Sequence, residues 1–389
     1  MEKGLLNPLE VMQECVQLAL IGKGYTKTNP CVGAIVAREN RIISRGWHEA
    51  YGQAHAEVNA IDNSPEPVDG ADLYVTLEPC SHHGKTPPCV EKIVKSGIRR
   101  VFIGVVDPNP VNAGKGVEYL KKHGVEVYIG YMEELCASII EDFTKYIYTK
   151  MPYFNVKAAQ SLDGKIASVT GDSKWITSQS SRAYSHYLRA VSDAVLVGVG
   201  TVQADDPELN IRHIRANTDP FKIVLDPNGR MTTDRKLIKN SAEKLIYVTS
   251  KDNDKANIMK DMGAKVIVVD YADKRLDLKA LSLKLAEMNI MNIMVEGGGD
   301  TIGSFFDAGL VDKVNFFIAP MIIGGCRTSV AGNGVESIAK SHKLTGVQTR
   351  QFEGDLLYTA NVSDYKTPVL ELTERIRGCC ACGCSAHKG

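Results

Sequence analysis

The sequence predicts an α/β protein made of two domains. The chain has 389 residues, and single cores usually stop growing beyond roughly 250–300 residues. Strand patterns and helix patterns alternate along the chain, which is typical of sheets covered by helices. This alternation pauses near residue 150 and then begins again. We therefore predict one domain over residues 1–150, a second over residues 151–365, and a tail over residues 366–389.

The hydrophobic periodicity places elements in both domains. In the first domain we expect helices at 9–22, 55–62, 88–96, 115–123 and 133–148, and strands at 32–36, 41–46, 73–77 and 101–106. In the second domain we expect helices between strands at 153–159, 194–199, 221–225, 244–249, 265–269, 292–296, 313–319 and 355–363.

Composition and charge narrow the class of protein. Hydrophobic residues are 44% and charged residues 24%, which excludes a mostly disordered chain. Forty-six basic residues balance forty-six acidic ones, so net charge gives no support to a nucleic-acid or membrane partner. No run approaches the ~20 apolar residues of a membrane span, and the first residues show no apolar run of signal length. With scattered cysteines, this predicts a reducing, cytoplasmic location.

The strongest chemical signal is His55-Ala56-Glu57 followed by Pro79-Cys80 and by Cys89. One imidazole and two thiolates form a three-ligand set that suits Zn²⁺ with its fourth position left for water, as in catalytic zinc sites. Glu57 lies two residues after His55, so it fits a proton carrier better than a fourth ligand. The alternative is an exposed histidine with two buried cysteines. Zinc deaminases show H-x-E and then P-C-x-x-C, but here residues 81–88 separate the two cysteines.

With its flanking motifs, this half resembles the deaminase half of the bifunctional riboflavin biosynthesis deaminase/reductase family. The motifs are Asn29-Pro30-x-Val32-Gly33, His55-Ala56-Glu57, the run from Thr76 to Cys89, and Asp107-Pro108-Asn109-Pro110. The resemblance implies a cytidine-deaminase-like α/β/α sandwich, with His55, Cys80 and Cys89 on zinc and Glu57 as catalytic acid/base. It also implies substrate contacts by Asn29, His48, Lys85, Asp107 and Asn109. Alternatively, Asn29 and Asn109 are turn residues before proline, and Lys85 is a solvated loop residue.

In the second half, a glycine-rich turn from Gly297 to Ser304 follows an apolar strand and opens a helix. Such a turn lets the backbone approach a phosphate at a helix N-terminus, although tight packing alone would also explain it. The turn lacks the G-x-G-x-x-G spacing of a standard dinucleotide fold. Further motifs accompany it: residues 157–167, residues 173–178, Arg189 and residues 201–212.

Together these motifs resemble the reductase half of the same family, whose domain is similar to dihydrofolate reductase. The resemblance implies that NADPH contacts Ala159, Trp175, Thr201, Asp205, Gly298, Gly299, Asp300, Thr301, Ile302, Gly303 and Ser304. It implies substrate contacts by Ser173, Arg189, Leu209, Arg212 and Glu296. Arg189 and Arg212 would act as a clamp on the substrate phosphate, because guanidinium groups bind phosphate bidentately. Lys157 and Asp205 are predicted to orient the sugar that is reduced. Alternatively, Arg189 and Arg212 are surface or strand-end residues and Trp175 belongs to the core.

The sequence thus predicts a bifunctional hydrolase and NADPH-dependent oxidoreductase that acts on a phosphorylated pyrimidine, with Zn²⁺ and NADPH as cofactors. We also expect a homo-oligomer. The rivals are a nucleic-acid or nucleoside deaminase and a ligand-binding protein with decayed sites. The cysteine-rich end, Gly378 to Gly389, matches no zinc-finger spacing. We predict that residues 366–389 form a disordered tail whose deletion leaves both activities intact.

Overall fold

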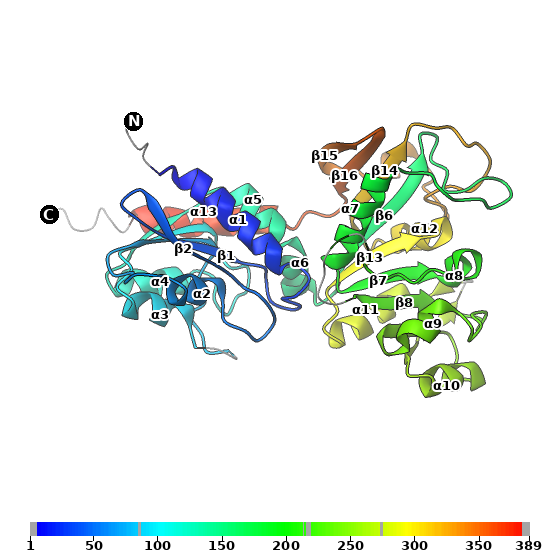
Figure 1. Ribbon diagram of the computed structural model, residues 1–389, viewed down its shortest axis with the longest axis horizontal. Helices are drawn as coiled ribbons and strands as arrows, with labels where there is room; N and C mark the ends of the chain where they lie inside the picture. The colour runs from blue at the N-terminus through cyan, green and yellow to red at the C-terminus, as the bar shows by residue number, and fades with distance from the viewer. Residues whose placement is uncertain (1–5, 85–86, 213, 215–218, 273–274, 383–389) are drawn as a thin grey trace. The chain divides into compact units, whose positions relative to one another are not determined.

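The computed structural model describes residues 6–84, 87–212, 214, 219–272 and 275–382. The chain divides into two compact units: unit 1 is Met1–Thr149 with Tyr365–Gly389, and unit 2 is Lys150–Asp364. Each unit has its own central sheet (Figure 1). Among the described residues, no helix has the length and apolar character needed to cross a membrane.

Unit 1 is built on a five-stranded sheet with the order β2-β1-β3-β4-β5. The strands are β1 (Gly33–Arg38), β2 (Arg41–Trp47), β3 (Asp72–Leu77), β4 (Arg100–Val105) and β5 (Glu126–Ile129). The β1 strand pairs antiparallel with both of its neighbours, whereas β3, β4 and β5 are parallel. The sequence analysis did not predict β5, whose four residues at the sheet edge are only partly buried.

Helices cover both faces of this sheet. They are α1 (Pro8–Gly22), α2 (Ala56–Asp62), α3 (Cys89–Lys95), α4 (Lys115–Lys122), α5 (Glu133–Ile139), α6 (Glu141–Thr149) and α13 (Thr367–Cys382). In Figure 1, α1, α5 and α13 lie on one side of the sheet and α2, α3 and α4 on the other, in agreement with their contacts. This is the predicted α/β/α sandwich. The single helix expected at 133–148 is divided at Ile140.

Unit 2 is built on a nine-stranded sheet with the order β10-β9-β8-β7-β13-β6-β14-β16-β15. Its strands are β6 (Tyr153–Ser161), β7 (Ala194–Gly198), β8 (Phe221–Leu225), β9 (Leu245–Thr249), β10 (Lys265–Val268), β13 (Asn292–Gly297), β14 (Val311–Ala319), β15 (Thr345–Phe352) and β16 (Asp355–Asn361). The first seven in spatial order are parallel, and β16 and β15 are antiparallel. A separate ribbon pairs β11 (Tyr271–Ala272) with β12 (Arg275–Leu276).

Each face of the unit 2 sheet packs against its own helices. The helical elements are α7 (Gln179–Ala190), α8 (Val199–Asp205), α9 (Lys236–Ser241), η1 (Ala242–Lys244), α10 (Asp254–Asp261), α11 (Leu278–Glu287), α12 (Gly299–Asp307) and η2 (Ile338–Lys340). One apolar core joins the sheet to α11 and α12, and a second joins it to α7, α8, α9 and α10. The loops that leave β7, β8 and β13 meet at the carboxyl edge of the parallel strands, where such sheets bind ligands.

The prediction of a disordered tail over residues 366–389 is wrong for residues 367–382, which form α13 and belong to unit 1. Pro368 lies in the first turn, where a helix tolerates proline. Val369 and Thr373 are fully buried and Ile376 is partly buried, so one face of the helix packs against β4, β5 and α5. This apolar stripe is short and includes a threonine, which explains why the periodicity did not reveal it. Residues 383–389 lie outside the described part of the chain.

Candidate active sites

Three potential metal ligands meet in unit 1. His55 is the N-cap residue of α2, Cys80 follows β3, and Cys89 is the first residue of α3. Their ligand atoms lie within 4.8 Å of one another: Nδ1 of His55 is 3.5 Å from Sγ of Cys80 and 3.3 Å from Sγ of Cys89. One nitrogen and two sulfurs at this separation suit tetrahedral Zn²⁺ with one open position.

The electrostatics of the cluster favour a bound cation. A hydrogen bond from the Cys89 side chain, together with a smaller contribution from His55, lowers the pKa of the Cys80 thiol to about 4 despite burial. The Cys89 backbone N–H also donates to Sγ of Cys80, at 3.3 Å. A thiolate is the form that binds zinc. The hydrogen bond with Cys80, and then burial, raises the pKa of the Cys89 thiol, so the two sulfurs share one readily formed thiolate. The donor set itself fits the metal predicted from the sequence.

Glu57 lies beside this cluster, in the first turn of α2. Its side chain lines the same cavity as His55 and Cys80, and the residue is only 4% exposed. Burial raises the pKa of the Glu57 carboxyl to about 7. A carboxyl group with a pKa near neutrality can both accept and return a proton at working pH.

The cavity next to the cluster has a volume of about 210 Å³. Four predicted substrate residues line it, namely Asn29, His48, Asp107 and Asn109; Lys85 lies outside the described residues. Burial raises the pKa of Asp107 to about 7. The wall of this cavity also contains four residues that the sequence analysis did not select: Tyr51, Gln53, His82 and Phe143. His82 lies within the quoted run from Thr76 to Cys89 but was given no role, whereas Tyr51, Gln53 and Phe143 lie outside the quoted motifs and reach the cavity only through the fold.

The imidazole of His48 is held by hydrogen bonds at both nitrogens. Its Nδ1 lies 3.0 Å from the carbonyl oxygen of Ala54, and its Nε2 lies 3.1 Å from Nδ2 of Asn29. Nδ1 can therefore donate to the carbonyl while Nε2 accepts from the Asn29 amide. Burial also lowers the pKa of His48, which favours this neutral form. His48 thus orients the amide of Asn29 in the cavity.

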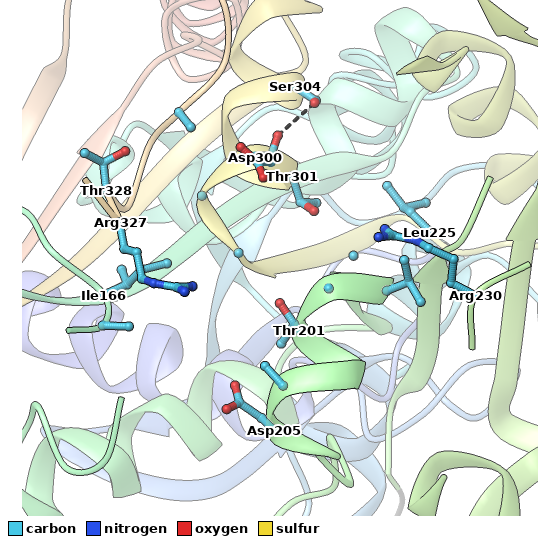
Figure 2. Close-up of a pocket in the computed structure, with 18 of the residues that line it drawn as sticks. Ile166, Thr201, Asp205, Leu225, Arg230, Asp300, Thr301, Ser304, Arg327 and Thr328 are labelled. Carbon is cyan, nitrogen blue, oxygen red and sulfur yellow. Dashed lines mark hydrogen bonds between the residues drawn. The ribbon is translucent and has the colours of Figure 1, made fainter. Parts of the chain in front are cut away.

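A second cavity, of about 560 Å³, lies at the carboxyl edge of the parallel strands in unit 2. Eight predicted residues line it: Ser173, Thr201, Asp205, Gly298, Gly299, Asp300, Thr301 and Ser304. Figure 2 shows Thr201 and Asp205 on α8 below the turn that carries Asp300 and Thr301. Gly298 is the N-cap residue of α12, so amide donors of that helix end face the cavity.

The glycines of this cavity have different roles. A Cβ atom at Gly299 would lie 2.2 Å from the Thr328 carbonyl oxygen, and one at Gly303 would lie 1.9 Å from that of Ala331. These two glycines are required by packing. In contrast, a Cβ at Gly200 would meet nothing within 4 Å, and one at Gly298 would meet only Thr201, at 3.7 Å. Gly200 and Gly298 therefore leave open backbone in the wall, which fits a phosphate-bearing cofactor.

Some residues predicted to contact NADPH do not line this cavity. Ile302 is 2% exposed and packs in the core, and Gly303 faces Ala331. Ala159 and Trp175 are likewise absent from the cavity wall. Trp175 is 70% exposed, and the guanidinium carbon of Arg182 lies 4.4 Å from its ring centre. The alternative that Trp175 belongs to the core is therefore excluded.

A buried charged cluster lies near the end of β13. Arg189 of α7 donates from Nε and one terminal nitrogen to the two carboxylate oxygens of Glu296, at 2.8 and 2.7 Å. Its other terminal nitrogen donates to the carbonyl oxygen of Asn210, at 2.9 Å. Burial would raise the pKa of Glu296, but Arg189 and Lys157 outweigh it and hold that pKa at about 2. Burial lowers the pKa of Lys157.

This pairing separates the two arginines that the sequence analysis grouped as a phosphate clamp. All three guanidinium nitrogens of Arg189 already have protein acceptors. Arg212 is exposed, and among the described residues its guanidinium pairs with Glu208, at 3.5 Å. Leu209 is 2% exposed and packs in the apolar core, so its side chain is not available to a ligand. The segment 209–212 is joined to Arg189 through Asn210.

Comparison with known proteins shows the same two-part organisation. The zinc-binding region of cytidine and deoxycytidylate deaminases matches residues 7–105, and the RibD C-terminal domain matches residues 152–358. Over 346 residues the chain is 44% identical to the riboflavin biosynthesis protein RibD of Aquifex aeolicus, covering 89% of this chain and 96% of that protein. The chain belongs to the RibD family. RibD of Bacillus amyloliquefaciens is 41% identical, with coverage of 91% and 96%.

Solved RibD structures confirm the predicted fold class. A diaminohydroxyphosphoribosylaminopyrimidine deaminase/5-amino-6-(5-phosphoribosylamino)uracil reductase from Thermotoga maritima is 34% identical, with a TM-score of 0.81 and coverage of 91% of this chain and 98% of that one. Acinetobacter baumannii RibD is also 34% identical, with a TM-score of 0.80 and coverage of 92% and 99%. The family and the donor set described above also support Zn²⁺ and NADPH as the cofactors.

Two features of this RibD chain were missed by sequence reasoning. One is a set of cavity arginines in unit 2: Arg230, Arg275 and Arg327. Arg275 pairs with Asp307, whereas the other two point into the cavity from opposite sides in Figure 2. The other is Glu78, whose carboxylate accepts hydrogen bonds from the backbone amides of Asp107, Gly114, Gly116 and Val117. The sequence signal that could have identified Glu78 is its position directly before Pro79-Cys80.

Proposed function

We propose that the two cavities catalyse consecutive steps of riboflavin biosynthesis. Unit 1 would hydrolytically deaminate 2,5-diamino-6-(5-phosphoribosylamino)pyrimidin-4-one, and unit 2 would use NADPH to reduce the ribosyl group of the product to a ribityl chain. The observation that carries the first step is the nitrogen and two sulfurs of His55, Cys80 and Cys89 beside the buried carboxyl of Glu57. Family membership supports the pairing of the two reactions.

In unit 1, His55, Cys80 and Cys89 would hold the zinc ion. When bound, Zn²⁺ lowers the pKa of a coordinated water so that hydroxide is available at neutral pH. Glu57 would accept one proton from the attacking water and give it to a ring nitrogen, and would then carry the remaining hydroxyl proton to the amino group, which leaves as ammonia while the ring keeps a carbonyl oxygen. Asn29, Asp107 and Asn109 line the cavity and would hold polar groups of the substrate, while His48 orients Asn29. Lys85 remains a proposed phosphate contact.

In unit 2, the cavity below Gly298 would hold NADPH, with Thr201, Asp205, Asp300, Thr301 and Ser304 around it. The hydride is supplied by the cofactor. Lys157 and Asp205 would orient the sugar, and the Arg189–Glu296 pair would fix the segment 209–212 next to it. Arg212, on that segment, would bind the substrate phosphate. Ser173 remains a proposed contact to the substrate. Ala159 and Trp175 remain proposed contacts to NADPH.

A coupled assay tests the proposal. The diamino-pyrimidine phosphoribosyl substrate is supplied with NADPH, and ammonia release and NADPH absorbance are followed together. We expect equimolar ammonia and NADPH oxidation, with ammonia alone when NADPH is omitted. Ammonia release from RNA but not from the free pyrimidine would favour the nucleic-acid deaminase instead.

We further propose that the protein is cytoplasmic and forms a homo-oligomer. Light scattering would measure the mass of the particle in solution and so test the oligomeric state.

Arg212→Ala is expected to raise the KM of the reductase for its phosphorylated substrate by about 10-fold, because one good charge-assisted phosphate contact is lost. Ammonia release should stay unchanged. Steady-state kinetics of both reactions provide the measurement. Lys236→Ala, which removes an exposed positive charge from α9, is the control and should change neither. An unchanged reductase KM in Arg212→Ala would exclude this arginine from phosphate binding.

Arg230 is the residue that we expect to distinguish NADPH from NADH. It shares a cavity wall with Leu225, Leu276 and Leu278, an apolar surface suited to adenine, and NADPH differs from NADH by the 2′-phosphate next to that base. Arg230→Ala should raise the Kd for NADPH by about 10-fold and leave that for NADH nearly unchanged, as measured by coenzyme fluorescence. Equal weakening of both coenzymes would contradict this role.

A further inference from the structure

The segment from Val106 to Val117 carries two cavity residues of the deaminase unit. It begins where β4 ends and leads into α4, and it brings Asp107 and Asn109 to the wall of the cavity. The backbone N–H of Asn109 donates a hydrogen bond to the Asp107 carboxylate, at 2.8 Å. The shape of this segment therefore decides where both side chains lie.

On one side the segment is bound by Glu78. The carboxylate of Glu78, 3% exposed, accepts from the amide of Asp107 at 3.1 Å and from that of Gly114 at 2.9 Å. It also accepts from Gly116 at 2.8 Å and Val117 at 3.2 Å. One carboxylate thus fixes both ends of the segment from the side of the zinc ligands.

The opposite support comes from α13. The backbone N–H of Val106 donates to Oγ1 of Thr373, at 3.0 Å, and that hydroxyl in turn donates to the carbonyl oxygen of Val369, at 2.7 Å. Val106 and Thr373 are both fully buried. The acceptor of this amide is therefore a side chain 267 residues later in the chain, and it acts on the residue directly before Asp107.

A second contact of α13 lies at the other end of the segment. A Cβ atom at Gly114 would lie 3.0 Å from Cδ1 of Ile376, so Ile376 packs against the same glycine whose amide Glu78 binds. Arg377 anchors the helix to α5 through Glu133, at 3.0 Å. The segment is thus held between Glu78 and α13 at both of its ends.

We propose that α13 positions the substrate-contacting segment of the deaminase, with Thr373 as its central positioning residue. The inference rests on the proposed function of unit 1, since Asp107 and Asn109 hold substrate there. A buried amide without an acceptor is unfavourable, so loss of the Thr373 hydroxyl lets Val106 and Asp107 shift. α13 then positions the deaminase cavity, although it follows the reductase unit in sequence.

Thr373→Val tests the proposal, because valine keeps the shape of threonine and removes the acceptor. We expect the deaminase KM to rise about 10-fold, since small displacements of binding groups cost this much or more, while kcat, zinc content and reductase kinetics stay within about two-fold. Thr373→Ser keeps the hydroxyl and should restore the KM. Glu374→Gln changes an exposed residue of the same helix and is the control.

Hydrogen exchange supplies a readout that does not depend on the reaction. Peptides covering residues 106–117 should exchange about 10-fold faster in Thr373→Val than in the parent or in Thr373→Ser, because the Val106 amide loses its acceptor. If the parent releases no ammonia from the pyrimidine, the proposed function fails, and faster exchange confined to this segment would still support the positioning role. Unchanged exchange with unchanged KM overturns it. A loss of zinc, kcat and reductase activity together also overturns it, because it indicates general destabilisation.

Discussion

Glu57→Gln is expected to lower the rate of ammonia release by about 10²- to 10⁴-fold, the usual contribution of a positioned general acid/base. Glutamine fills the same space beside the metal ligands but cannot carry a proton. The parent carboxyl is buried, with a pKa raised to about 7, so it can exchange a proton near neutral pH. Zinc content should stay unchanged, because His55, Cys80 and Cys89 keep their ligand atoms.

Two measurements are needed for this variant: steady-state ammonia release and the metal content of the purified protein. Glu118→Gln, an exposed glutamate in the first turn of α4, is the matched control and should keep full activity. Near-normal turnover in Glu57→Gln would remove Glu57 from the proton transfer. If the zinc were lost instead, Glu57 would be acting on the ligands, and the assignment of its role would have to change.

The zinc ligands could be predicted from sequence because each lies in a short local motif at the start of a helix or the end of a strand. The role of Glu78 could not, because it depends on four amides between 29 and 39 residues away. The same holds for α13. Its buried face contains few apolar residues, and the packing partner of Thr373 lies 267 residues earlier in the chain. Local periodicity carries no information on such contacts.

Strands at the edge of a sheet are also hard to predict from sequence. The β15 strand is exposed over almost its whole length, so it has no alternation between buried and exposed residues for sequence analysis to detect. The central strands, in contrast, are buried on both faces and appear as apolar runs close to their observed bounds. Tertiary pairing also explains why the predicted grouping of Arg189 with Arg212 does not hold. Glu296, 107 residues away in sequence, accepts hydrogen bonds from the Arg189 guanidinium.

Arg189→Ala is expected to destabilise unit 2 by about 3–5 kcal/mol, the cost of leaving one partner of a buried ion pair without the other. Of the groups that lower the pKa of Glu296, Lys157 and His186 would remain, and the carbonyl oxygen of Asn210 would lose its Arg189 donor. The folded-state pKa of Glu296, about 2, lies below its ordinary value. The pair therefore stabilises the fold at neutral pH and stops doing so as the pH falls through about 2. The difference between variant and parent should accordingly be largest near pH 7 and shrink in acid.

Urea unfolding followed by circular dichroism, at pH 7 and at lower pH, gives the free-energy differences. Arg212→Ala is the matched control: it removes an exposed arginine from the same segment and should change stability by less than about 0.5 kcal/mol. The two variants are thus expected to separate cleanly, Arg189→Ala in stability and Arg212→Ala in substrate KM. An Arg189→Ala protein that unfolds like the parent but loses affinity for the phosphorylated substrate would contradict the structural role. It would show that Arg189 leaves Glu296 and binds the substrate phosphate, the contact that the family resemblance implied for it.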